Sequence, residues 1–217
     1  MKNRQKTALF AFAAAALVVG CASVPGAADL DKLTADIVKA SFRDEGIVKA
    51  SVLDTDETNR VCSAADVSGK PLDEDTVKRI EAINLMTIKA PPNGKYLGDW
   101  KEGEKIAQSG RGLTYTDDAK TANGGNCYNC HQIDKKEISF GTIGPSLTNY
   151  GKIRGVADPA SPEAKPIVDY TWGKIWNSKA YNACSNMPRA GHMGILNAAQ
   201  IADVMALLLD PKSPVNQ

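Results

Sequence analysis

The sequence predicts an all-α protein in which a partly helical N-terminal extension precedes a core domain. Apolar residues recur at helical spacing in several segments, and no segment shows convincing strand alternation. A cluster of prolines and glycine in "KAPPNGK" (Lys89–Lys95) interrupts the chain. We therefore expect an N-terminal extension over residues 29–95 and a core domain over residues 96–217.

The first 28 residues have the composition of an export signal. A basic start, "MKNRQK", precedes the apolar stretch Ala8–Gly20, whose 13 residues are too few to span a bilayer. Two ends of the signal fit equally well. "VVGC" resembles a lipobox, which would end the signal at residue 20 and lipidate Cys21, whereas "GAA" before Asp29 would end it at residue 28. We expect a periplasmic protein, either soluble or tethered to a membrane through Cys21.

The charge of the chain argues against nucleic acid as its main partner. The formal net charge is +1, and Lys2, Arg4 and Lys6 supply three positive charges in a segment without acids. Removal of residues 1–28 therefore leaves a formal charge of −2 and no basic tract.

Two helices are expected in the extension and three in the core domain. Those of the extension cover "DLDKLTADIVKASF" and "EDTVKRIEAINLM". In the core domain, the pair Asp99 and Glu102 begins a helix that runs to about Ser109. A second helix covers "IVDYTWGKIWNSKAY". The third begins at the capping pair Asn197 and Gln200 and ends before a proline; its apolar stripe contains Ile201, Val204, Met205 and Leu208.

The segment "GNCYNCHQ" contains a C-x-x-C-H motif, the attachment signature of c-type haem. Thiols at this spacing project from the same turn of helix, so each can add to one of the two haem vinyl groups. The following histidine then faces the iron from the same side. We expect Cys127 and Cys130 to bind one haem c covalently and His131 to be the proximal iron ligand.

Other interpretations of this motif explain fewer of its residues. A zinc ribbon needs a second pair of ligands, which the sequence lacks. A thioredoxin-like C-x-x-C would follow a strand in a βαβ unit. A disulfide between Cys127 and Cys130 would leave His131 without a role.

The ring N–H of His131 needs a hydrogen-bond acceptor that orients the imidazole. "GTIGPSL" (Gly141–Leu147) follows at a suitable distance, and the carbonyl of Pro145 is the candidate. The alternative is a simple proline turn.

The sixth iron ligand is expected in "CSNMPRAGHMG" (Cys184–Gly194). Met187 is favoured, because a thioether in a polar loop between two helices is difficult to explain as core. His192 and the thiolate of Cys184 are the alternatives.

Two cysteines remain once the haem thiols and Cys21 are set aside: Cys62 and Cys184. In an oxidising compartment spare thiols tend to pair, so we expect a Cys62–Cys184 disulfide. Two free, buried cysteines are the alternative.

Residues 96–217 resemble SoxX, the family of monohaem cytochrome c subunits of SoxAX complexes in bacterial sulfur oxidation. The resemblance rests on Cys127–His131, "GTIGPSL", "IWNSKAYNACSNMPR" and "GILNAAQIADVMALLLDPKSPVN". It implies a class I cytochrome c fold with a low-spin His/Met haem. Class I cytochromes usually pack an aromatic side chain of the last helix against a glycine of the first. Here Gly103 is available, but Leu207 occupies the aromatic position.

The resemblance also implies a function and partners. A SoxA-type cytochrome subunit would complete a heterodimer and carry the catalytic haem of an L-cysteine S-thiosulfotransferase. That enzyme joins thiosulfate oxidatively to a cysteine of the SoxYZ-type sulfur carrier and releases two electrons. The haem of the SoxX-type subunit receives electrons and passes them to a downstream cytochrome c.

Two further functions remain compatible with the sequence. The first is a free-standing periplasmic electron carrier, and the second is a haem sensor with a labile sixth position. The extension of about seventy residues favours the subunit role, because a simple shuttle does not need it. We expect this extension to hold the partner.

Overall fold

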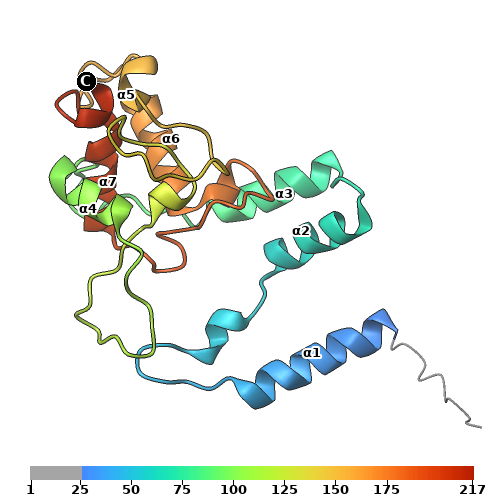
Figure 1. Cartoon of the computed structure of the whole chain (residues 1–217). Helices are drawn as coiled ribbons and strands as arrows, with labels where there is room; N and C mark the ends of the chain where they lie inside the picture. Colours follow the sequence, from blue (N-terminus) through green and yellow to red (C-terminus); the bar gives the residue numbers. More distant parts are fainter. Residues whose placement is uncertain (1–25) are drawn as a thin grey trace, which may run out of the picture. The chain divides into compact units, whose positions relative to one another are not determined.

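The computed structural model describes residues 26–217. Its longer regular elements are all helices, which confirms the predicted all-α class (Figure 1). Within this range no helix combines the length and apolar character needed to cross a membrane. The export signal and Cys21 lie outside the described residues.

The chain divides into two units, Met1–Arg43 and Asp44–Gln217. The first unit contains α1 (Ala27–Ser41), which matches the helix expected after residue 29. Its apolar residues Leu30, Leu33 and Ile37 are about half exposed, at 46%, 50% and 53%.

The first α-helices of the second unit are α2 (Glu57–Ser68) and α3 (Glu74–Leu85). The sequence predicted α3 but not α2. The side chain of Asp56 caps α2 by accepting a hydrogen bond from the backbone N–H of Asn59 at 2.8 Å. The helix ends at Gly69, whose φ of 64° is left-handed. Both helices belong to the same compact unit as the core domain.

The segment after α3 is bonded to the core domain. In α6 (Lys165–Trp176), the indole N–H of Trp172 donates to the carbonyl of Lys89 at 2.8 Å. The indole N–H of Trp176 donates to the carbonyl of Thr87 at 3.0 Å. The stretch between α3 and the proline-rich segment is therefore hydrogen-bonded to α6.

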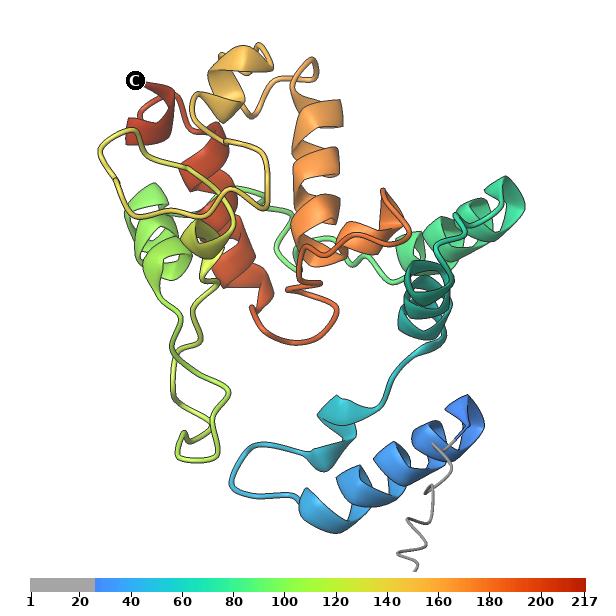
Figure 2. The ribbon, with the colours of Figure 1, turned by 45° about the vertical axis from the view of Figure 1, so that its right-hand side comes forward.

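The core domain is built around α7 (Ala198–Leu209), which lies between α4 (Trp100–Gln108) and α6 (Figure 2). Eight of its 12 residues are buried, as the predicted apolar stripe requires. The remaining helical elements are short: η1 (Ala50–Leu53), η2 (Cys127–Asn129), α5 (Tyr150–Ile153), η3 (Ser178–Ala180) and η4 (Pro214–Asn216).

The helix caps agree with the sequence except at Glu102. Asn197 and Gln200 form the predicted reciprocal capping box of α7. Asp99 caps α4 by accepting from Lys101 N at 2.9 Å. Glu102 does not complete a box there, because its carboxylate pairs with Lys105 at 2.6 Å.

Helices α4 and α7 cross in direct contact at Gly103. A Cβ atom on Gly103 would lie 2.1 Å from the backbone oxygen of Asp203 and 3.1 Å from Cβ of Leu207. Leu207 is fully buried at this crossing. The contact expected between these two positions is therefore present, with a leucine in place of the aromatic side chain.

Substitution Gly103→Ala tests this close approach. Glycine to alanine in a helix ordinarily stabilises by about 1 kcal/mol. Here we expect a loss of about 1–2 kcal/mol, because the new methyl group overpacks the backbone of α7. Urea unfolding measures the difference. The control Glu102→Ala, on the exposed side of α4, should stay within about 0.5 kcal/mol of the parent. A Gly103→Ala protein as stable as the parent would contradict the crossing.

Candidate functional site

The C-x-x-C-H motif forms a single tight turn, η2. The backbone N–H groups of Cys130 and His131 both donate to the carbonyl of Cys127, at 3.1 and 2.9 Å. The two thiols and the imidazole therefore project from the same turn, as their spacing predicted.

Backbone hydrogen bonds attach this turn to the end of α4. Gly125 N donates to the carbonyl of Ile106 at 2.8 Å, and Asn126 N donates to that of Ser109 at 2.9 Å. Asn126 has a left-handed φ of 50°, which asparagine tolerates better than most residues. The helix that crosses α7 thus also positions the motif.

The loop Gly141–Leu147 lies against the motif and orients His131. The Nδ1 atom of His131 lies 2.7 Å from the carbonyl oxygen of Pro145, as predicted. Since a carbonyl only accepts, Nδ1 donates its proton in this bond, and Nε2 is the ring nitrogen left to bind a metal. Gly144 N donates to the carbonyl of Cys130 at 2.8 Å and holds the loop in place. The imidazole is therefore set up as a metal ligand.

Gly144 packs directly against the imidazole. A Cβ atom at this position would lie 2.2 Å from Cε1 of His131. Any side chain here would displace the ring. Sequence reasoning did not find this role, although the glycine stands directly before Pro145 in the quoted loop.

The cysteines divide as the sequence predicted. Cys62 and Cys184 form a disulfide, and Cys127 and Cys130 are free thiols. Because Cys127 and Cys130 are free, the alternative disulfide between them is absent. The Cys62–Cys184 bond removes the Cys184 thiolate as an iron ligand. Burial raises the pKa of the Cys127 thiol to about 11, which keeps it protonated at neutral pH.

Met187 is partly buried and packs against the hydrophobic core. Its backbone is held on both sides: the hydroxyl of Ser178 donates to its carbonyl at 2.6 Å, and its N–H donates to the hydroxyl of Ser185 at 3.2 Å. The alternative ligand, His192, is exposed.

A half-buried carboxyl lies next to the motif. Oε1 of Glu104 accepts from the hydroxyl of Tyr128 at 2.9 Å and from Nε2 of Gln108 at 2.8 Å. Oε2 is buried and has no hydrogen-bond partner. Burial raises the pKa of Glu104, and the charges of Asp134 and Glu137 add to this effect.

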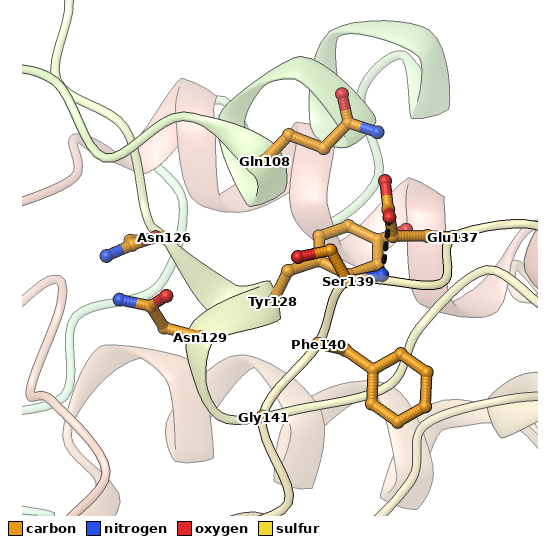
Figure 3. A pocket seen from close by; sticks show the side chains of 8 residues that line it. All are labelled: Gln108, Asn126, Tyr128, Asn129, Glu137, Ser139, Phe140 and Gly141. Carbon is orange, nitrogen blue, oxygen red and sulfur yellow. Dashed lines mark hydrogen bonds between the residues drawn. The ribbon is translucent and has the colours of Figure 1, made fainter.

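An open cavity of about 550 Å³ lies on the Tyr128 side of the turn (Figure 3). Its lining is mainly polar and consists of Gln108, Asn126, Tyr128, Asn129, Glu137, Ser139, Phe140 and Gly141. Neither motif cysteine nor His131 lines it. This cavity is therefore not where the motif would hold a prosthetic group.

The residues of the motif fit a haem. Two unpaired thiols, an oriented imidazole and a glycine against its ring form a donor set suited to a planar group rather than a bare ion. Between residues 26 and 217 no cluster of three or more His, Cys, Asp or Glu could hold a metal ion alone. Ile143, in the loop that orients His131, is also a large exposed apolar side chain, as expected of a wall that a haem covers.

Residues 102–211 match the family model of cytochrome c, which is half of the chain. The chain belongs to the cytochrome c family. Membership implies covalently bound haem c and electron transfer, in agreement with the motif. The matched range begins in α4 and ends just after α7, so it contains the helix crossing at Gly103.

This cytochrome also has a relative in Aquifex aeolicus (strain VF5), named "uncharacterized lipoprotein". The two sequences are 39% identical over 132 residues. The alignment covers 60% of this chain and 59% of the relative, so the chain spans about six tenths of the relative's length.

Substitution Glu104→Gln should change the pH dependence of stability. The pKa of Glu104 is raised above 4.5 in the folded state, so its ionisation disfavours folding. We expect the parent to lose stability relative to the variant as the pH rises through 4.5 and above. Urea unfolding of both proteins from pH 4 to 7 measures the difference. Glu102→Gln, on the exposed face of the same helix, should show a much smaller pH dependence. If the difference in unfolding free energy between the parent and Glu104→Gln did not change with pH, the burial of this carboxyl would be contradicted.

Proposed function

We propose that the protein is the electron-accepting, SoxX-type cytochrome subunit of a periplasmic thiosulfate-oxidising complex. The electron-transfer part rests on one observation, the hydrogen bond between His131 Nδ1 and the carbonyl of Pro145 beside two free thiols. The thiosulfate part rests on the resemblance in residues 96–217.

Each residue has a defined role in this proposal. Cys127 and Cys130 form the thioether bonds to haem c, and His131 binds the iron through Nε2. Pro145 orients the imidazole, and Met187 supplies the sixth ligand. Haem with these ligands supplies a one-electron iron couple of raised potential.

The proposed ligand set favours electron transfer over chemistry at the iron. With His131 and Met187 both bound, no position remains for a substrate. The chain has a single C-x-x-C-H motif, so the catalytic haem is expected on the SoxA-type partner.

The reaction of the proposed complex supplies the electrons. The thiolate of a carrier cysteine and the terminal sulfur of thiosulfate form a disulfide-like S–S bond, which releases two electrons. The cytochrome accepts these one at a time and passes them to a downstream cytochrome c. The chain thereby acts within an L-cysteine S-thiosulfotransferase without performing the bond-forming step itself.

We also propose that Cys21 tethers the mature protein to a membrane. The lipobox-like "VVGC" and the word lipoprotein in the name of the relative support this end of the signal. The intact mass of the mature protein tests it. A mature protein that starts at Asp29 would contradict lipidation.

The function is tested by purification of the native protein, followed by addition of thiosulfate and the sulfur-carrier protein. We expect a second cytochrome to copurify and the haem absorption to show reduction only when both additions are present. A protein that purifies alone and accepts electrons from unrelated cytochromes would instead be a free-standing carrier.

Substitution Met187→Ala tests the sixth ligand. We expect loss of the methionine charge-transfer band of the oxidised protein and binding of carbon monoxide by the reduced protein, because a coordination position opens. The matched control is Met193→Ala, an exposed methionine six residues further along the same loop. It should keep the band. If Met187→Ala keeps the band, another methionine is the ligand. A parent protein that lacks the band would instead point to His192.

A further inference from the structure

Helix α2 is attached to the Met187 loop on both sides of the methionine. Cys62 of α2 is disulfide-bonded to Cys184, three residues before Met187. Asp56, the N-cap of α2, pairs with Arg189, two residues after it, at 2.6 Å. One helix therefore holds both flanks of the proposed ligand.

The ion pair between Asp56 and Arg189 is buried on the arginine side and has further charged groups around it. The side chain of Arg189 is 7% exposed, whereas that of Asp56 is 41% exposed. Lys179 is 8% exposed and adds a second positive charge that acts on Arg189 and Asp56. His192 also feels the charges of Arg189 and Asp56. A buried guanidinium that loses its carboxylate is strongly destabilising, and Asp56 is the carboxylate that pairs with it here.

The partners of Asp56 lower the pKa of its carboxyl group. Burial acts to raise its pKa, but the hydrogen bond from Asn59 N and the Arg189 guanidinium outweigh burial and lower the pKa. Asp56 is therefore ionised at neutral pH, and the ion pair is intact under all but acidic conditions.

A chain of buried side chains fixes α2 to the core domain. Nδ2 of Asn84 in α3 donates to the hydroxyl of Thr58 in α2 at 3.1 Å. Nδ2 of Asn177, at the end of α6, donates to Oδ1 of Asn84 at 2.9 Å. The next residue, Ser178, donates to the carbonyl of Met187. The loop is thus held between α2 and η3, two elements that are themselves connected.

We propose that α2 is a positioning element for Met187, acting through Asp56–Arg189 and Cys62–Cys184. This inference rests on the proposed role of Met187 as the sixth iron ligand. It gives part of the N-terminal extension an intramolecular role, distinct from binding a partner. Asp56 and Arg189 are positioning residues, because they act on the ligand through its loop.

Substitution Asp56→Asn tests the ion pair. Asparagine caps a helix as well as aspartate does, so α2 keeps its N-cap while Arg189 loses its anion. The matched control is Asp73→Asn. Asp73 caps α3 in the same way, by accepting from Thr76 N at 2.8 Å, and it is exposed.

The measurement is a titration of the oxidised protein towards alkaline pH. Its midpoint is the pH at which the methionine charge-transfer band is half lost as the pH is raised. For Asp56→Asn we expect the midpoint to fall by about one pH unit, which corresponds to about tenfold weaker retention of the ligand. The reduced variant should also bind carbon monoxide at neutral pH. Asp73→Asn should match the parent in both measurements. The variant Asp56→Glu keeps a carboxylate and should recover part of the shift.

The outcomes separate this inference from the proposed function. A parent protein without the band would overturn Met187 as ligand. A parent with the band, together with Asp56→Asn equal to Asp73→Asn, would overturn the positioning role and leave the function intact. If Asp56→Asn does not fold, the double variant Cys62→Ser and Cys184→Ser decides: a lowered midpoint supports the inference, and an unchanged midpoint overturns it.

Discussion

The close approach of α4 and α7 at Gly103 is the constraint on which the haem site depends. The absence of a side chain lets the backbone of α7 lie against α4, with Leu207 filling the remaining space. The end of α4 then holds the C-x-x-C-H turn through the hydrogen bonds of Gly125 and Asn126. A displacement at the crossing would therefore move the motif as well as open the core.

Different segments of the site attach the prosthetic group and orient its histidine ligand. In the proposed site the two cysteines would bind the prosthetic group, while the loop Gly141–Leu147 orients the imidazole that follows them. The loop is joined to the motif by backbone bonds and by the contact of Gly144 with the ring. Because the orientation comes from the backbone, it is independent of side-chain rotamers.

Much of this arrangement could be predicted from short sequence patterns. The motif, the Pro145 acceptor, the Asn197 capping box and the Cys62–Cys184 pair each follow from spacing or counting. Helix α2 was missed because its apolar stripe is weak, although Asp56 and Gly69 carry ordinary cap signals. The Asp56–Arg189 pair joins residues 133 positions apart, and the contact of Gly144 with His131 depends on a loop conformation. Local patterns do not encode either of these, because they arise only when the chain is folded.

The division of the cysteines places a demand on the maturation of the protein. Of the three full pairings of these four thiols, the one that joins Cys62 to Cys184 also joins Cys127 to Cys130, whereas here Cys127 and Cys130 stay free. The order in which the thiols react therefore matters. If Cys127 or Cys130 were oxidised before haem attachment, the thioether bonds could not form. If the protein matures in an oxidising compartment, as proposed, its assembly requires a route that keeps these two thiols reduced while Cys62 and Cys184 form their disulfide.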